Sequence, residues 1–179
     1  MKVLNSIKCM VVALSAGLFF MSNSVNAETP HLTDPEIAHV AVVANQIDVN
    51  YGKIALKKSK NAEVIKFATA MIKDHEAIIA SASALCKKLG VTPKTNAVSQ
   101  SLLAGEKETT AKLNNLKGKA FAKAYIDNEV AYHEAVISAV KNVLIPQTQN
   151  AELKQTLINV TPLLEHHLKM AKMAQEKIK

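Results

Sequence analysis

The sequence lacks several residues and motifs that mark common classes of protein. Tryptophan is absent, aromatic residues make up only 4% of the chain, and its 179 residues include five glycines and two cysteines. No Ser/His/Asp arrangement, glycine-rich phosphate loop or Cys-x-x-Cys motif is present. Val, Ile and Thr do not alternate with polar residues as they would in strands. These absences argue against a β fold and against triad hydrolases, phosphate-loop proteins and dithiol redox proteins.

Cysteine is also too scarce for a disulfide framework. Cys9 lies in the N-terminal apolar run, so its removal with that run would leave Cys86 alone. A lone cysteine cannot form an intramolecular disulfide. We expect Cys86 to be a buried or half-buried helix residue, with an intermolecular bridge or soft metal ligation as the alternatives.

The N-terminus has the features of a signal peptide. Lys2 and Lys8 precede the apolar run "CMVVALSAGLFFM", and "VNA" before Glu28 fits a cleavage site with small residues. We predict a signal peptide over residues 1–27, a disordered start over 28–33 and one domain over 34–179. An uncleaved N-terminal anchor helix is the alternative. The mature protein is expected in the periplasm, with outer-membrane association open and no transmembrane segment after cleavage.

The charge of the chain is mildly basic. The formal net charge is +7, and it falls to +5 when Lys2 and Lys8 leave with the signal peptide. The lysines are scattered rather than gathered into a dense run with interleaved aromatic residues, so we expect no nucleic-acid partner. An envelope protein or an anionic surface remains a candidate partner.

Apolar residues recur three and four positions apart over long stretches, which predicts helices. Asn61 and Asn150 suit helix N-termini, Gly90 suits a C-terminus, and Pro146 is expected to end a helix. The predicted helices cover residues 34–58, 62–89, 99–116, 119–144 and 151 to the C-terminus. Short connections favour an all-α, up-down four-helix bundle, with the shorter helix between the second and third long ones.

Each long predicted helix places one ionisable residue on its apolar stripe. These residues are Asp48, His75, His133 and His167. Unpaired, they would be costly to bury, so they need partners. Three imidazoles and one carboxylate suit one divalent transition metal such as zinc, copper or iron. A closed hydrogen-bond network that fixes helix register is the alternative.

Further polar residues are expected around these four. Pro162 should bend or loosen the last helix just before His167. We interpret Glu129 as the partner of a surface pair with His133, four residues away, and place His166 at the flank of the bundle or in solvent. The predicted surrounding residues are Tyr51, Asp74, Tyr125, Glu129, Tyr132 and His166.

Several segments resemble an exported bacterial family, domain-of-unknown-function family 4142. They include "TDPEIAHVAVVANQIDVNYGKIAL", "EVIKFATAMIKDHEAI", "SQSLL", "FAKAYIDNEVAYHEAVI" and "LIPQTQNAELKQTLINVTPLLEHHLKMA". The resemblance covers nearly the whole mature chain and implies a ferritin-like bundle outside the cytoplasm. The family's recurrent histidines fall on His75, His133 and His167. The resemblance implies no activity.

The sequence departs from the di-iron pattern of many ferritin-like proteins, which use Glu-x-x-His motifs. Ile72, Val130 and Leu164 stand three residues before the three histidines. Three functions therefore stay open: a periplasmic metal-binding module, a structural or interaction protein of the envelope, and a redox enzyme at a metal. Because no nucleophile or acid–base pair stands out, we expect a binding or structural role rather than catalysis.

Overall fold

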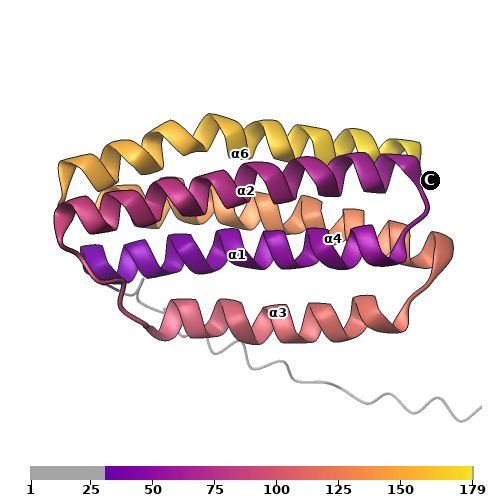
Figure 1. Cartoon of the computed structure of the whole chain (residues 1–179), viewed down its shortest axis with the longest axis horizontal. Coiled ribbons are helices and arrows are strands. Elements are labelled where there is room, and N and C mark those ends of the chain that lie inside the picture. The colour runs from indigo at the N-terminus through magenta and orange to yellow at the C-terminus, as the bar shows by residue number, and fades with distance from the viewer. Residues whose placement is uncertain (1–30, 179) are drawn as a thin grey trace, which may run out of the picture.

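The computed structural model describes residues 31–178, which form helices and no strands. The elements are α1 (Asp34–Lys58), α2 (Ala62–Leu89), α3 (Ala97–Asn115), α4 (Gly118–Ala139), a π-helical turn η1 (Val140–Leu144), α5 (Ile145–Gln147) and α6 (Ala151–Lys177) (Figure 1). The all-α prediction is confirmed. The predicted signal peptide, residues 1–27, lies outside the described residues. Of the predicted start, only residues 31–33 are described, and there Leu32 is buried and its N–H donates to Gln147 Oε1.

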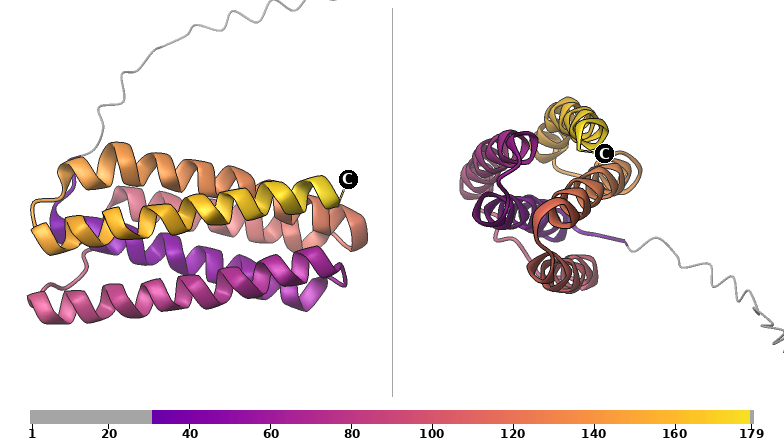
Figure 2. Two further views of the ribbon diagram at one scale, coloured as in Figure 1. Left: turned by 90° about the horizontal axis from the view of Figure 1, so that it is seen from above. Right: turned by 90° about the vertical axis from the view of Figure 1, so that its right-hand side faces the viewer.

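Four long helices lie side by side around one interior. α1 packs against α2, α4 packs against α6, and contacts between α2 and α6 and between α1 and α4 close the ring. The shorter helix α3 lies outside this ring against α1, as Figure 1 and the right view of Figure 2 show. The position of α3 in the chain agrees with the predicted short helix between the second and third long ones.

The helices begin where the sequence supplies capping groups. The Asn61 side chain accepts from the N–H groups of Glu63 and Val64, and the Asn150 side chain accepts from those of Glu152 and Leu153. Such side-chain oxygens satisfy N–H groups that have no partner within the helix. Both predicted caps are therefore confirmed.

The start of α1 is tied to the start of α6. Both carboxylate oxygens of Asp34 accept backbone N–H groups, from Gln149 at 2.8 Å and from Asn150 at 2.8 Å. Glu36 reaches back to the N–H and hydroxyl of Thr33, in a capping-box arrangement. These contacts fix the ends of two helices that both contribute to the interior site.

The prediction that Pro146 ends its helix was wrong. Helical structure continues through Pro146 to Gln147, after a π-helical turn over Val140–Leu144. In that turn the N–H of Ile145 donates to the carbonyl of Val140, one residue further back than in an α-helix. We attribute the continuation to this widened turn, which gives the proline ring room against the preceding carbonyls.

Helix α6 likewise continues through a proline. Pro162 lies inside α6 and is exposed. Because it has no N–H, it leaves the carbonyl of Ile158 without its helical donor, and Ile158 is itself 43% exposed. Solvent can therefore supply the missing hydrogen bond.

The buried apolar side chains form two clusters along the ring of helices. One contains Phe67, Met71, Phe121 and Tyr125, and the other contains Ile37, Leu144, Leu157 and Leu164. Along α6, His167 lies between Leu164 of one cluster and Ala171 of the other. The polar residues thus occupy the middle of the molecule with apolar packing on both sides.

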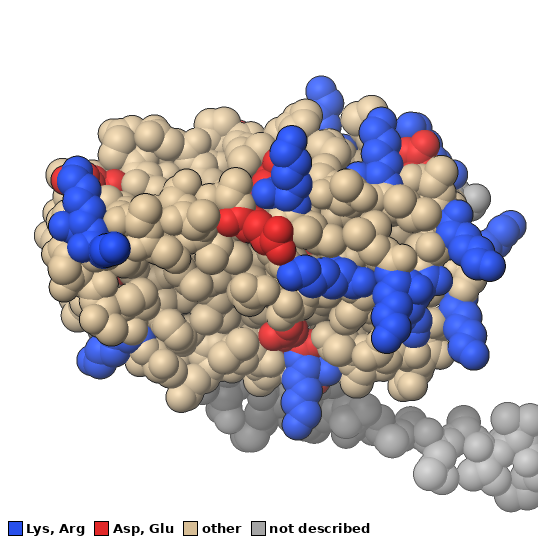
Figure 3. Space-filling model, in the orientation of Figure 1, with Lys and Arg blue, Asp and Glu red and all other residues tan. Residues whose placement is uncertain are grey.

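The outer surface is charged, and no helix in the described part of the chain is long and apolar enough to cross a membrane. Figure 3 shows that lysines gather toward the end of the molecule where α1 ends and α2 begins, with acidic residues between them. The last turn of α1 carries Lys57 and Lys58 there.

A close approach of two helices gives a test of the packing. A Cβ at Gly52 in α1 would lie 2.8 Å from Ile72 Cγ1 and 3.3 Å from the carbonyl oxygen of Ala68, whereas a Cβ at Gly105 in α3 would meet nothing within 4 Å. Gly105→Ala should stabilise the protein by about 0.5–1 kcal/mol through helix propensity. Gly52→Ala should be about 1–3 kcal/mol less stable than Gly105→Ala, because its added methyl group overpacks the α1–α2 contact. Urea unfolding of both variants measures the difference, and equal stabilities would rule out the tight α1–α2 contact.

Candidate metal centre

The structure brings together the four ionisable residues that the stripes selected. Asp48 comes from α1, His75 from α2, His133 from α4 and His167 from α6, and each residue is at most 3% exposed. The ring centroids of the three histidines lie 5.0, 5.6 and 5.7 Å apart. One ring nitrogen from each lies within 4.8 Å of the other two. Four helices distant in sequence therefore meet at one buried point.

Each histidine has one ring nitrogen held by a partner outside the centre. His75 Nδ1 donates to Asn45 Oδ1 at 2.6 Å, and His133 Nδ1 donates to the carbonyl oxygen of Glu129 at 2.9 Å. His167 Nε2 donates to Asp74 Oδ2 at 3.0 Å. Because each acceptor is an oxygen, the donating nitrogen carries the proton, and the tautomer of each ring follows.

The other nitrogen of each ring has no hydrogen-bond partner in the described protein. These atoms are His75 Nε2, His133 Nε2 and His167 Nδ1, and each is buried. With the proton fixed on the opposite side of the ring, each presents an unprotonated lone pair. A carboxylate or carbonyl that orients the far side of a ring is the usual support of a metal-binding histidine.

The fourth group, Asp48, sits at distances that fit a shared ion. Its Oδ2 lies 3.3 Å from His75 Nε2 and 3.4 Å from His133 Nε2. A tetrahedral site with metal–ligand distances of about 2.0–2.1 Å has ligand–ligand separations of about 3.3–3.4 Å. The space that these three residues border has a volume of about 10 Å³. His167 does not border this small space.

Glu129 was wrongly interpreted as a surface residue. It is fully buried, and Oε2 lies 3.6 Å from His133 Nδ1. Its carboxylate oxygens make no hydrogen bond of good geometry in the described protein, although the buried Tyr125 hydroxyl interacts with this carboxyl. With Asp48 and His133, Glu129 forms a second group of close metal-ligand atoms. The buried stripe of α4 passes through Ala122, Ile126, Glu129 and His133, whereas Val130 is only half-buried. The position of Glu129 on this apolar stripe could have predicted its burial, but a charged residue is ordinarily assigned to the surface.

Burial shifts the protonation of every group at the centre toward the neutral form. Desolvation raises the pKa of Asp48 to about 8, and it raises the pKa of Glu129 well above its ordinary value, with the Asp48 charge adding to the effect. Desolvation lowers the pKa of His75 to about 2 and that of His133 to about 4. It also lowers the pKa of His167, against the opposing effect of Asp74. At neutral pH the ring lone pairs are therefore available.

A hydrogen-bond network does not satisfy these atoms. The neutral Asp48 carboxyl has one proton to donate, and three bare ring nitrogens are present. Glu129 lies beside His133 Nδ1, which is already a donor, so its proton serves none of them. At least two buried acceptors are left without a donor from the protein, at a cost of about 1–3 kcal/mol each.

The remaining predicted residues surround the centre in different ways. Tyr132 donates from its hydroxyl to the carbonyl of Ala44 at 2.9 Å, and its ring packs edge-on against those of Tyr51 and His133. Tyr125 is fully buried beside Phe67 and Phe121. His166 is exposed, in agreement with its predicted place at the flank of the bundle or in solvent, and its inclusion among the residues surrounding the centre was wrong.

Asn45, which holds His75, is a functional residue that the sequence reasoning did not select. It lies three residues before Asp48 and four after Ala41, so the helical spacing placed it beside the α1 stripe. Its amide is fixed in turn, since Nδ2 donates to the carbonyl of Ala41 at 2.7 Å. Cys86 is buried in α2, as expected, and is not among the residues of the centre.

Comparison with known proteins identifies a family but no activity. No curated protein and no solved structure matches the chain. A family model described as Domain of unknown function (DUF4142) matches residues 21–174, a span that contains α1, α2, α4 and all the residues of the centre. The chain therefore belongs to the DUF4142 family.

Proposed function

We propose that this protein is an exported, ferritin-like four-helix-bundle protein that binds one divalent transition-metal ion at Asp48, His75, His133 and His167. It would act as a binding module of the periplasm, in the role of a metal buffer, carrier or sensor. Export is supported by the sequence of residues 1–27. The ferritin-like assignment is supported by the ring of four long helices with its polar centre.

One observation carries the metal proposal. All three histidines are held through one nitrogen, and the other nitrogen of each is buried without a hydrogen-bond partner in the described protein. The second nitrogens of His75 and His133 lie 3.3 and 3.4 Å from Asp48 Oδ2. A core selected only for stability would avoid such atoms, because each loses its hydrogen bond to water on burial. A metal ion would satisfy all three at once.

The donor set favours a borderline metal. Three imidazoles and a carboxylate suit zinc, and they also suit copper or iron. Glu129 adds charge balance, because a divalent cation beside ionised Asp48 and Glu129 makes a centre with no net charge. Buried charge is tolerated when it is compensated in this way. No Glu-x-x-His pair is present at these positions, so the donors do not reproduce the di-iron arrangement.

Metal content of two histidine variants tests the proposal directly. Protein purified without a histidine tag should contain or take up about one equivalent of zinc, copper or iron, measured by elemental analysis after titration and desalting. His167→Gln should lose this ion because a ligand is removed. His166→Gln changes the exposed neighbour and should retain it.

Less than about a tenth of an equivalent in the unmodified protein, with no stabilisation on titration, would refute the metal site. Equal metal content in both variants, with a change of stability only in His167→Gln, would instead support the structural alternative of a core hydrogen-bond network.

The hydrogen bond from His167 to Asp74 gives a second prediction. Asp74→Ala should weaken metal affinity by about 10–100-fold, because the ring loses the acceptor that fixes its tautomer. Glu76→Ala is the matched control, since it removes an exposed carboxylate of the same helix that pairs with Lys53 and lies outside the centre. Competition with a chromophoric chelator measures both affinities. If the two variants lose affinity equally, Asp74 does not support the site.

Metal binding should also release a proton from Asp48. Burial holds the pKa of this carboxyl at about 8, so at pH 7 it is protonated in the metal-free protein and must ionise to become a ligand. Affinity should therefore rise with pH until about pH 8. Calorimetry at pH 7 in buffers of different ionisation enthalpy should show release of about one proton or more per ion. The Asp48→Asn variant should release about one proton fewer per bound ion. If the unmodified protein releases no proton, Asp48 is not a ligand.

A further inference from the structure

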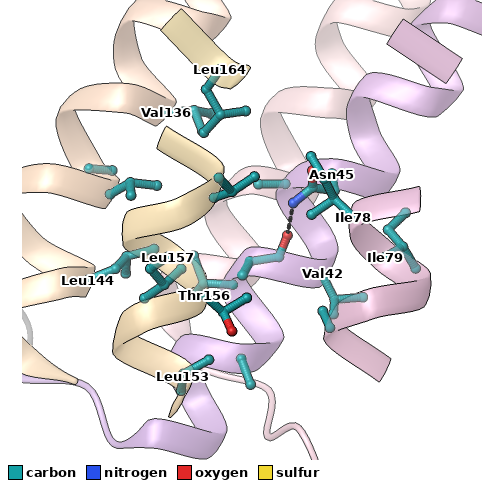
Figure 4. Close-up of a pocket in the computed structure, with 18 of the residues that line it drawn as sticks. Val42, Asn45, Ile78, Ile79, Val136, Leu144, Leu153, Thr156, Leu157 and Leu164 are labelled. Carbon is teal, nitrogen blue, oxygen red and sulfur yellow. Dashed lines mark hydrogen bonds between the residues drawn. The ribbon is translucent and has the colours of Figure 1, made fainter. Parts of the chain in front are cut away.

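A large apolar pocket lies beside the metal centre. It has a volume of about 290 Å³ and is bordered by all four long helices and the start of α3. Figure 4 shows Leu153, Leu157 and Leu164 of α6 facing Ile78 and Ile79 of α2 across it. For comparison, a cavity of about 150 Å³ lined by aliphatic and aromatic side chains stays dry and binds benzene. The pocket therefore has room for roughly a dozen carbon atoms.

The polar side chains of the pocket wall already make hydrogen bonds within the protein. Asn45 uses its amide on Ala41 and His75, and the Tyr132 hydroxyl donates to Ala44. The Thr156 hydroxyl donates to the carbonyl of Glu152 at 2.8 Å. Because most of the wall is aliphatic, a polar molecule entering the pocket would lose hydrogen bonds to water and find few replacements, whereas a hydrocarbon loses nothing of this kind. Water is disfavoured for the same reason, since a buried water needs two or more polar partners.

The pocket is continuous with the surroundings of the metal centre. Ala44, Asn45, Tyr132, Val136 and Leu164 line both the pocket and the small space bordered by Asp48, His75 and His133. A molecule in the pocket would thus lie against the Asn45 amide that holds His75. The shared residues place the pocket ligand next to the metal centre. The apolar lining of the pocket is the same whether or not the centre holds an ion.

We propose that this pocket binds one small uncharged hydrocarbon, such as a bicyclic aromatic or a medium-length alkyl group. Its aliphatic lining and the polar groups already bonded within the protein select against charged or strongly hydrogen-bonding ligands. The protein would thereby have two separate binding capacities, one for a metal ion and one for an apolar molecule.

Naphthalene, with ten carbon atoms, is a suitable probe. Titration into the full mature protein should produce saturable, one-to-one shifts of methyl NMR signals from residues such as Ile79 and Leu157, and leave the exposed methyls of Leu103 unmoved. The titration is run on metal-free and on zinc-loaded protein. Binding to the metal-free form separates this proposal from that of the metal site.

Two variants fill the pocket from different walls. Ala82→Phe on α2 and Ala41→Leu on α1 should each weaken naphthalene binding at least about tenfold, because the side chain takes the ligand's space. Ala84→Phe is the control, since Ala84 is exposed on α2 and does not line the pocket. If Ala82→Phe does not fold, naphthalene binding to Ala41→Leu tests the proposal. The proposal is overturned if no saturable shift occurs, or if a folded filling variant binds naphthalene as well as Ala84→Phe does.

Discussion

The structure depends on one unusual constraint, the presence of ionisable side chains at the point where all four long helices meet. A helix bundle ordinarily fills this point with aliphatic residues, which need no partners. Here three imidazoles and two carboxyls are buried, and desolvation drives each toward its neutral form. The outer nitrogens of the rings are held by Asn45, Asp74 and the carbonyl of Glu129. The apolar clusters on both sides must offset the remaining cost of these inward-facing atoms.

Much of this arrangement could be predicted from the sequence, because helical spacing and capping are local properties. The four residues of the centre were identifiable because each interrupts an apolar stripe, and their convergence needed only short connections between antiparallel helices. Asn61 and Asn150 cap the helices that their positions indicated. The same reasoning failed at Glu129, where a charged residue was assigned to the surface. Its burial depends on the neutralising environment that other helices create, and its own helix does not reveal that environment.

Other features depend on three-dimensional packing and have no comparable signal. The π-helical turn before Pro146 lets the helical structure after α4 accommodate the proline while the chain still packs on α6. From the sequence alone, the proline predicts that the helix ends there. The apolar pocket is harder still to foresee. Sequence identifies the leucines and valines that face inward, but the empty volume is set by how closely the helices approach, as Gly52 allows for α1 and α2. Asn45 gained its role because it reaches His75 on a neighbouring helix.

The origin of each donor on a different helix has a kinetic consequence. Asp48, His75, His133 and His167 are joined only through the assembled ring of α1, α2, α4 and α6, and each is almost completely shielded from solvent. An ion bound among them, as proposed, would be shielded from solvent by these helices, so its departure would require them to separate locally. Its residence time would then depend on the opening rate of the protein as well as on the strength of the metal–ligand bonds. A bound ion would in turn slow the opening that releases it, since it links all four helices.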